Sequence, residues 1–312
     1  MTEKIAGKLF ADKYRVDSIL RSSELGNFYR ARHAFTERPV ILQIMRAELA
    51  NDAAAAERFS ELAKSISQIS HPDVLSVTDF GRTASGQPYA TLENVEGETL
   101  REALVRDGQV PYTVAFDVSR SAASGLAAAH EAGLIHGNLN TGNILVVYDA
   151  DGSKTVKLFD FGSANPIANG ANGEIIARDF AYVAPELCSG AEKPDALSDV
   201  YSLGVVLYEM LAGDVPFTGS TAAEVINRQT EDPPPPLSSF RTDLSANVEP
   251  IVLKALAKNP EMRYQSAGEF ADAIELYAAG PGDAAASDAG NGNNMWKRHL
   301  SFSRESRCFP RF

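Results

Sequence analysis

Cysteine is scarce in this chain: its 312 residues include two, Cys188 and Cys308. Two cysteines are too few for a disulfide framework and show no metal-ligand spacing, which favours a reducing compartment. The sequence also lacks an apolar run of about 18 residues, so we expect no transmembrane segment. Because the first residues lack the apolar stretch of a signal peptide, we expect a cytoplasmic protein.

Positively charged residues are fewer than negatively charged ones. Lysine and arginine number 29 against 41 aspartates and glutamates, a formal net charge of -12. Binding to nucleic acid needs a basic face, so this balance argues against nucleic acid as a partner. The remaining composition, 44% hydrophobic and 22% charged, is typical of a globular protein with a substantial core.

Hydrophobic periodicity divides the chain into a strand-rich part and a helical part. Over residues 14–93, apolar residues alternate or run in short segments between polar boundaries, which predicts strands. Within this part, residues 53–69 carry apolar side chains at helical spacing. After residue 98 the patterns are helical, with an amphipathic stretch over 113–132 and an almost wholly apolar one over 197–211. The pattern predicts an α+β fold.

Several short motifs follow one another in order along the chain. They are Tyr14-Arg15-Val16, His71-Pro72, Val95 to Leu100, Ile135 to Leu145, Asp160-Phe161-Gly162, Ala184-Pro185-Glu186, Asp199 and Arg263. In this order they resemble the bacterial Ser/Thr protein kinases of eukaryotic-like type, over roughly residues 10–279. The resemblance implies a bilobal fold. A small antiparallel-β N-lobe with one large helix would span 10–95, and a mainly helical C-lobe would span 96–279.

Residues 280–312 differ from the rest in composition. Gly, Ala, Asp and Asn dominate residues 280–294, which predicts a flexible segment without a core. Residues 295–312 then contain five Lys or Arg against one Glu, together with four aromatic residues. A basic, aromatic end of this kind is suited to weak contact with an anionic membrane surface or an acidic partner. A tail without function is the favoured interpretation.

The family's catalytic loop has the pattern H-R-D-x-x-x-x-N, and this chain departs from it at the reactive residue. His136 and Asn143 are kept, but Asn138 stands at the catalytic-base position and Asn140 at the substrate-lysine position. An amide has no basic lone pair near neutral pH, so Asn138 can orient a hydroxyl group but cannot take its proton. The resemblance therefore leaves no intact catalytic residue.

The nucleotide-binding positions are degenerate as well. Gly26 is the glycine that remains of three in the Gly-rich loop, Gln43 replaces the phosphate-pairing lysine, and Leu62 replaces its glutamate partner. Losing both members of that ion pair avoids an uncompensated buried charge. Phe28 and Ile41 are larger than the family's residues over adenine, so we expect them to fill part of that slot. The degenerate positions are Gly26, Phe28, Ile41, Gln43, Leu62 and Leu145.

Asn143 and Asp160 keep the pair that holds magnesium in the family, an amide oxygen and a carboxylate. One interpretation is residual binding of magnesium or magnesium–ATP. The other, favoured by the loss of the lysine, is hydrogen bonding within their own loop. We therefore expect no required cofactor, with weak ATP and magnesium binding as the alternative. The resemblance assigns structural roles to His136, Phe161, Gly162, Glu186, Asp199 and Arg263.

These losses lead to one main hypothesis and two alternatives. The main hypothesis is a pseudokinase, a catalytically impaired domain that acts as a scaffold or allosteric module for a protein partner such as an active kinase or another signalling protein. The alternatives are a weak or unconventional nucleotide-dependent Ser/Thr kinase and a module that binds ATP without turnover. A replacement cation in the cleft would favour an enzyme. Arg21, Arg30 and Arg32 are candidates by proximity, although we expect them at the surface.

Overall fold

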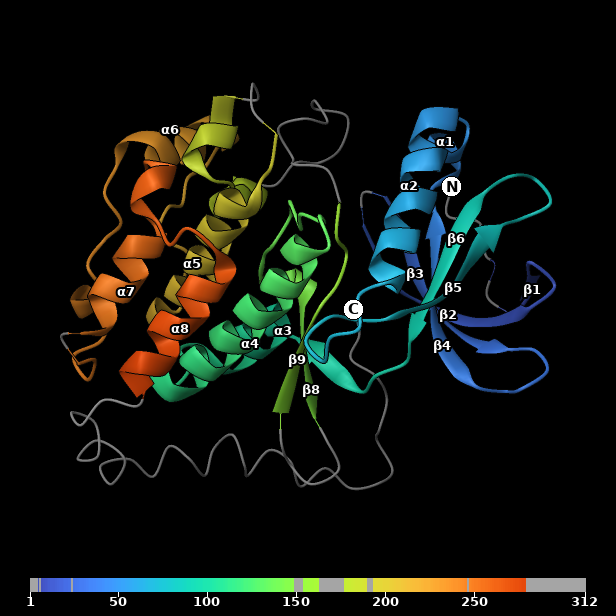
Figure 1. Ribbon diagram of the computed structural model, residues 1–312, viewed down its shortest axis with the longest axis horizontal. Helices are drawn as coiled ribbons and strands as arrows, with labels where there is room; N and C mark the ends of the chain where they lie inside the picture. Colours follow the sequence, from blue (N-terminus) through green and yellow to red (C-terminus); the bar gives the residue numbers. More distant parts are fainter. Residues whose placement is uncertain are drawn as a thin grey trace.

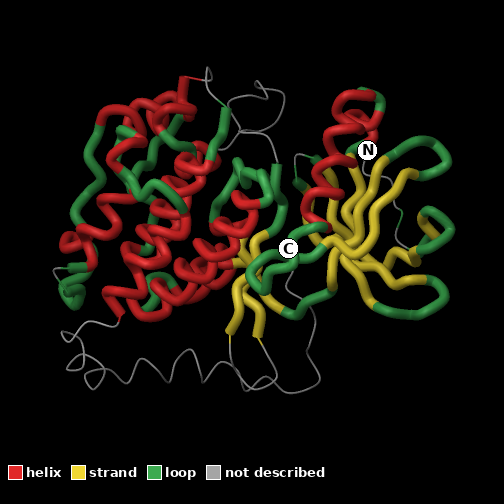
Figure 2. Tube along the Cα trace, viewed as in Figure 1, coloured by secondary structure: helices red, strands yellow, loops and turns green. Residues whose placement is uncertain are grey.

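The computed structural model of the chain has two lobes joined by a short connection (Figure 1). The structure describes residues 5, 7–23, 25–148, 154–162, 177–189, 193–245 and 247–278. The predicted flexible tail over 280–312 lies outside them. Most strands gather in one lobe and most helices in the other, so the α+β class predicted from the periodicity is confirmed (Figure 2).

The N-lobe is built on a six-stranded antiparallel sheet in the order β1-β2-β3-β4-β6-β5. Alternating side chains give the sheet its two faces: in β2, Tyr14 and Val16 are buried, whereas Arg15 and Asp17 are exposed. The strands are β1 Leu9–Phe10, β2 Tyr14–Ser22, β3 Gly26–His33, β4 Pro39–Met45, β5 Val77–Arg82 and β6 Pro88–Glu93.

One long helix, α2 (Ala53–Ser67), packs on this sheet beside β5 (Figure 1). It begins at Asp52, whose side chain accepts hydrogen bonds from the backbone N–H groups of Ala54 and Ala55. The buried residues of α2 recur at helical spacing: Ala56, Phe59, Ala63 and Ile66. This is the single large helix that the resemblance implied for the N-lobe. A shorter helix, α1 (Ala47–Ala50), precedes it.

The C-lobe packs around α5 (Ala196–Ala212), in which every residue from Ser198 to Ala212 is buried. Helix α4 (Tyr112–Glu131) lies against α5 and α8 and also contacts β9 of a small three-stranded sheet, β7-β8-β9. Hydrophobic periodicity does not predict this sheet, because its strands are too short to show a period. The other elements are β7 Gly97–Thr99, β8 Ile144–Tyr148, β9 Lys154–Leu158, α3 Leu100–Asp107, α6 Ala222–Glu231, α7 Val248–Ala255 and α8 Ala267–Ala278. In the part of the chain that is described, no helix is both long and apolar enough to cross a bilayer.

A buried ion pair fixes the C-lobe segment around Glu186. Arg263 Nη1 donates to Glu186 Oε1 at 2.7 Å, and Nη2 donates to Oε2 at 2.6 Å. The other guanidinium N–H groups donate to the carbonyl oxygens of Ala257, Leu197 and Lys258. Arg263 is 2% exposed, so this full use of its donors is what offsets the cost of burying the charge.

Replacing Arg263 tests how much the fold depends on this pair. In Arg263→Met the Glu186 carboxylate loses its cation in a mostly buried position, so we expect the free energy of unfolding to fall by about 3–5 kcal/mol. Arg32→Met is the matched control, because the Arg32 contact with Asp17, at 3.4 Å, is exposed and contributes less than about 1 kcal/mol. Urea unfolding followed by circular dichroism measures both variants. Equal losses would show that burial of the pair does not matter.

Candidate functional site in the cleft between the lobes

The loop over residues 135–145 is positioned by one buried carboxylate. Asp199, in the first turn of α5, is 1% exposed and accepts hydrogen bonds from the backbone N–H groups of His136, at 2.8 Å, and Gly137, at 2.9 Å. His130 Nε2 bonds to the same carboxylate at 2.8 Å. The backbone at Gly137 has a φ of +72°, which glycine adopts without strain. Helix α5 therefore holds this loop in place.

His136 and Phe161 make a buried contact between the loop and the segment after β9. Their ring centroids lie 4.5 Å apart, and Gly162 N donates to the His136 carbonyl oxygen at 2.9 Å. Burial lowers the pKa of His136, so its ring is neutral. Phe161 belongs to the same hydrophobic core as Ile66 of α2, which connects the C-lobe to the N-lobe. Asp160 has a φ of +61°, a left-handed conformation that aspartate tolerates better than most residues.

Three asparagines of the loop bond to its own backbone and to one another. Asn143 Nδ2 donates to the Asn138 carbonyl oxygen at 2.8 Å, and Asn140 Nδ2 donates to the same oxygen at 3.0 Å. Asn140 Oδ1 accepts from Gly142 N at 2.9 Å. The residue at the substrate-lysine position is therefore folded back on the loop.

The guanidinium group of Arg21 contacts the side-chain oxygens of Asn143 and Asp160, the pair that the resemblance assigns to magnesium. Arg21, near the end of β2, reaches into the cleft, where Nη1 donates to the Gly142 carbonyl oxygen at 2.7 Å and Nη2 donates to Asn143 Oδ1 at 3.0 Å. Nη2 also pairs with Asp160 Oδ2 at 3.3 Å, and the side chain of Asp160 is 1% exposed. The expectation that Arg21 lies at the surface is wrong, because these three acceptors offset the cost of burying its charge. Arg32 is exposed, as expected.

Two aromatic rings complete the surroundings of Arg21. Its Cζ lies 5.6 Å from the ring centroid of Phe28 and 5.0 Å from that of Phe159, at distances typical of cation–π contacts. The two rings meet edge to face with centroids 6.0 Å apart. Burial lowers the pKa of Arg21, and the Asp160 carboxylate opposes that shift. An arginine keeps its proton in such surroundings, so a cation is fixed in the cleft.

Phe28 and Phe159 belong to a hydrophobic cluster that joins both lobes. Ile41 of β4 and Leu145 of β8 are 5% and 3% exposed, and Phe28 is 3% exposed. The buried members of the cluster are Leu20, Phe28, Ile41, Leu75, Leu92, Leu145, Val147 and Phe159. The positions that the resemblance assigns to adenine thus pack in one cluster.

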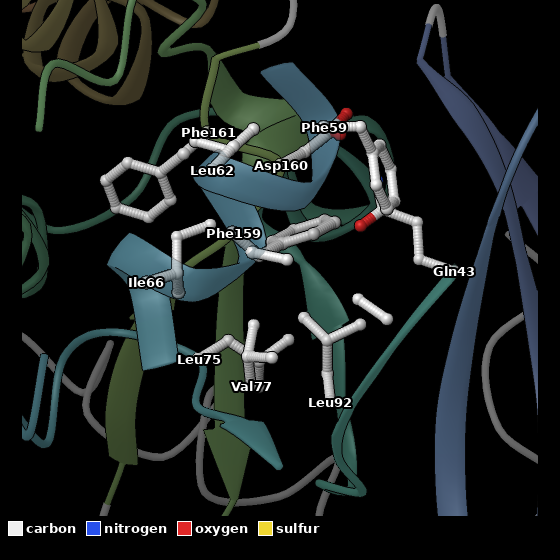
Figure 3. A pocket seen from close by; sticks show the side chains of 12 residues that line it. Gln43, Phe59, Leu62, Ile66, Leu75, Val77, Leu92, Phe159, Asp160 and Phe161 are labelled. Carbon is white, nitrogen blue, oxygen red and sulfur yellow. The ribbon is translucent and has the colours of Figure 1, made fainter. Parts of the chain in front are cut away.

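A small pocket lies between α2 and the sheet (Figure 3), with a volume of about 380 Å³ including its open mouth. Gln43 and Leu62, at the positions of the family's lysine–glutamate pair, both line it, together with Asp160. The other lining side chains are apolar, so the lining holds no cation in place of the lysine. Glu61, one position before Leu62, is exposed and does not replace the glutamate.

The oxygens of Asn143 and Asp160 do not fit a magnesium ion in this arrangement. Magnesium needs oxygen ligands at about 2.0–2.1 Å in octahedral geometry. Here Asn143 Oδ1 and Asp160 Oδ2 both accept from Arg21 Nη2, so a metal ion on this pair would lie against a guanidinium of like charge. Elsewhere in the described ranges, no three His, Cys, Asp or Glu side chains are grouped to hold a metal.

Comparison with known proteins identifies the family. A family profile described as "Protein kinase domain" matches residues 14–273. The chain belongs to the protein kinase family. The serine/threonine-protein kinase PknB of Mycobacterium leprae is 35% identical over 281 residues, which covers 88% of this chain and 44% of that kinase. PknA of Mycobacterium tuberculosis is 34% identical over 280 residues, which covers 88% and 63%. The chain therefore spans less than two thirds of the length of these two kinases.

A solved kinase structure shares the fold. The kinase domain of PknI from Mycobacterium tuberculosis matches with a TM-score of 0.68 at 28% identity, over 87% of this chain and 98% of that domain. The bilobal kinase fold that the ordered motifs implied is therefore confirmed.

Sequence reasoning missed several residues of this kinase cleft. Phe159 lies directly before Asp160-Phe161-Gly162. The signal in the sequence that could have identified it is an aromatic residue next to a motif. His130 directly follows the apolar run 126–129 of an amphipathic helical stretch, and a polar residue at such a place is a sign of a buried hydrogen bond. Arg101 lies shortly after the predicted boundary between the lobes at residues 95 and 96. Nothing in the sequence around it indicated a functional residue.

The role of Asp199 is testable against a neighbouring aspartate. In Asp199→Asn, the new Nδ2 group has to face N–H donors in a buried place, so we expect the free energy of unfolding to fall by about 2–3 kcal/mol. Asp195→Asn is the control, because Asp195 caps the same helix by accepting from Ser198 N at 2.8 Å and asparagine caps equally well. Denaturant midpoints of both variants give the comparison. A loss in Asp195→Asn as large as in Asp199→Asn would contradict the assignment.

Proposed function

We propose that this member of the kinase family is a pseudokinase, which binds a protein partner and does not transfer phosphate. The observation that carries the proposal is the position of Arg21. Its guanidinium gives Asn143 and Asp160 an internal cation where an active kinase places a metal ion. With this cation, the oxygens of Asn143 and Asp160 have a partner in the absence of metal and nucleotide.

The three lost catalytic roles support the same proposal. Asn138 cannot act as a base, because an amide is not basic near neutral pH. Asn140 bonds to its own loop, and Gln43 lines an apolar pocket without supplying a charge to a phosphate. Each missing role alone lowers the rate of a kinase by orders of magnitude, and the effects overlap in a way that does not multiply.

The packing of Phe28 and Ile41, at the positions that the resemblance places over adenine, supports weak or absent ATP binding. An adenine ring would have to separate Phe28 from its contact with Phe159, within the cluster that includes Ile41 and Leu145. An aromatic contact of this kind is worth about 0.5–1.5 kcal/mol beyond its buried area. That cost is subtracted from any affinity for the base.

The preserved interior supports a binding role. Asp199 fixes the catalytic loop, His136 packs on Phe161, and Arg263 pairs with Glu186. These contacts keep a kinase-shaped surface in place, so a partner such as an active kinase or another signalling protein meets a preformed interface. Preformed surfaces bind with a smaller ordering cost than mobile ones.

Arg21 is also the replacement cation in the cleft that we expected to favour an enzyme, so it supports a second candidate, a module that binds a nucleotide or transfers phosphate slowly. A guanidinium in the cleft can pair with phosphates in place of the family's lysine, which Gln43 replaces in this chain. For that, Arg21 has to leave the oxygens of Asn143 and Asp160 and the phenyl ring of Phe28. Because this movement breaks several contacts, we rank the nucleotide-binding function below the pseudokinase function.

Thermal unfolding with and without magnesium and ATP tests the internal cation. We expect no magnesium-dependent shift in the wild-type chain. In Arg21→Met the Asn143 and Asp160 oxygens become accessible, so we expect magnesium to stabilise the protein, by about 1.4 kcal/mol at ten times its Kd. Arg32→Met, which removes an exposed arginine of the same sheet, is the control and should behave as wild type. A wild-type shift with magnesium–ATP that disappears in Asp160→Ala would show that the nucleotide site survives, and would favour the second candidate over an internal cation.

Phosphoryl transfer tests the loss of chemistry directly. Radiolabelled ATP is incubated with the wild-type chain, with Asp160→Ala and with Asn138→Asp, and transfer to the chain and to a generic protein substrate is counted. We expect all three to give the same background. Restoring the base alone should not restore activity, because Gln43 and Leu62 still lack the charges of the lysine–glutamate pair. Transfer by the wild type that Asp160→Ala abolishes would show an enzyme.

A further inference from the structure

The cleft contains a second guanidinium that the proposed function leaves unused. Arg101, in the first turn of α3, is partly buried, and its Nε is covered without a hydrogen-bond partner. Within the described ranges, its hydrogen bonding is one long contact from Nη2 to Asn140 Oδ1, at 3.4 Å. Its Cζ lies 5.9 Å from the ring centroid of Tyr182. No carboxylate in this part of the chain forms an ion pair with it, so its charge is poorly compensated.

Arg101 and Arg21 meet around Gly142. Arg21 Nη1 donates to the Gly142 carbonyl oxygen at 2.7 Å, and a Cβ atom at position 142 would lie 3.5 Å from Arg101 Nε. Two cations held close together in a partly buried place repel each other unless an anion lies between them. This arrangement is typical of anion recognition by clustered arginines.

In the described part of the chain, neither of the two acidic groups near this pair of arginines forms an ion pair with Arg101. The side chain of Asp160 is 1% exposed and pairs with Arg21. Glu102 accepts with Oε2 from the backbone N and Oγ1 of Thr99, at the start of its own helix. Asn138 is neutral where an active kinase carries a carboxylate, so one charge that would repel a phosphate group is absent, and the charge of Asp160 is paired with Arg21. The partly exposed groups at this point are Arg21, Arg101, Asn138 and Asn140.

We propose that Arg101 binds the phosphate group of a phosphorylated Ser or Thr side chain on a partner protein, with the side-chain amide of Asn138 and the guanidinium N–H groups of Arg21 that Gly142, Asn143 and Asp160 leave unused. The site takes the kind of group that an active kinase produces, and it needs no metal. This inference rests on the proposed function, because magnesium–ATP in the cleft requires Arg21 to move.

A phosphate monoester matches these donors better than a carboxylate. It carries a charge of about -1.5 to -2 at pH 7 and three acceptor oxygens. Guanidinium N–H groups pair with phosphate oxygens in a bidentate manner, and an amide adds a further donor. A phosphorylated side chain is favoured over a nucleotide, because Phe28 and Ile41 are buried in the cluster where a base would bind.

Two-dimensional NMR of the arginine Nε–H resonances tests the site in the full chain. The probes are phosphoserine with blocked termini, unphosphorylated serine with blocked termini, inorganic phosphate and ATP without metal. We expect saturable shifts of the Arg101 and Arg21 signals with the phosphoserine probe, weaker ones with inorganic phosphate, and none with the serine probe. Arg101→Gln should raise the Kd for the phosphoserine probe at least about tenfold, because a charged hydrogen bond is lost.

Arg106→Gln is the matched control on the same helix. It removes the same charge, but Arg106 pairs with Glu98 and Asp107 and should leave the affinity unchanged. Arg101→Lys, which keeps the charge and loses the bidentate donors, should give an intermediate Kd and serves if Arg101→Gln does not fold. The inference is overturned by equal losses in Arg101→Gln and Arg106→Gln, by absence of phosphoserine binding, or by tighter Arg101-dependent binding of ATP. The first two outcomes leave the pseudokinase proposal intact, because phosphoryl transfer alone decides it.

Discussion

The cleft depends on one buried carboxylate. Asp199 receives two backbone N–H groups of the catalytic loop and the ring of His130, and it comes from the most deeply buried helix of the C-lobe. With the loop backbone held, the His136 ring meets Phe161, and Asp160 turns into the cleft with a positive φ. The core of the C-lobe therefore holds in place the oxygen atoms that Arg21 of the N-lobe contacts.

Two arginines of the same chemistry play different parts in this arrangement. Arg263 uses its donors within the C-lobe, on Glu186 and nearby carbonyl oxygens, and is 2% exposed. Arg21 crosses from the N-lobe to the C-lobe, and its side chain is still 21% exposed. Exposure weakens an ion pair and lets water compete for it. The contact of Arg263 is thus suited to holding a lobe together, whereas that of Arg21 is suited to setting the relation between lobes.

The sequence predicted the fold more fully than the geometry of the cleft. Ordered motifs report on the fold because each occupies a fixed place in it. Gln43 and Leu62 could be placed by counting along a strand and a helix, and both line the same pocket. The position of Arg21 could not be predicted, because a long side chain at the end of a strand has many rotamers and the closed cleft selects one. The contact of Phe28 with Phe159 likewise depends on how the lobes meet.

Kept metal-ligand positions in a degenerate kinase do not by themselves imply a metal. Asn143 and Asp160 provide oxygen acceptors, and a guanidinium satisfies such acceptors as a metal ion does, with hydrogen bonds in place of coordination bonds. A chain that loses the phosphate-pairing lysine but gains an arginine on this oxygen pair still has a reason to keep both acceptors. The kept D-F-G aspartate pairs with Arg21 and so takes part in a contact between the lobes.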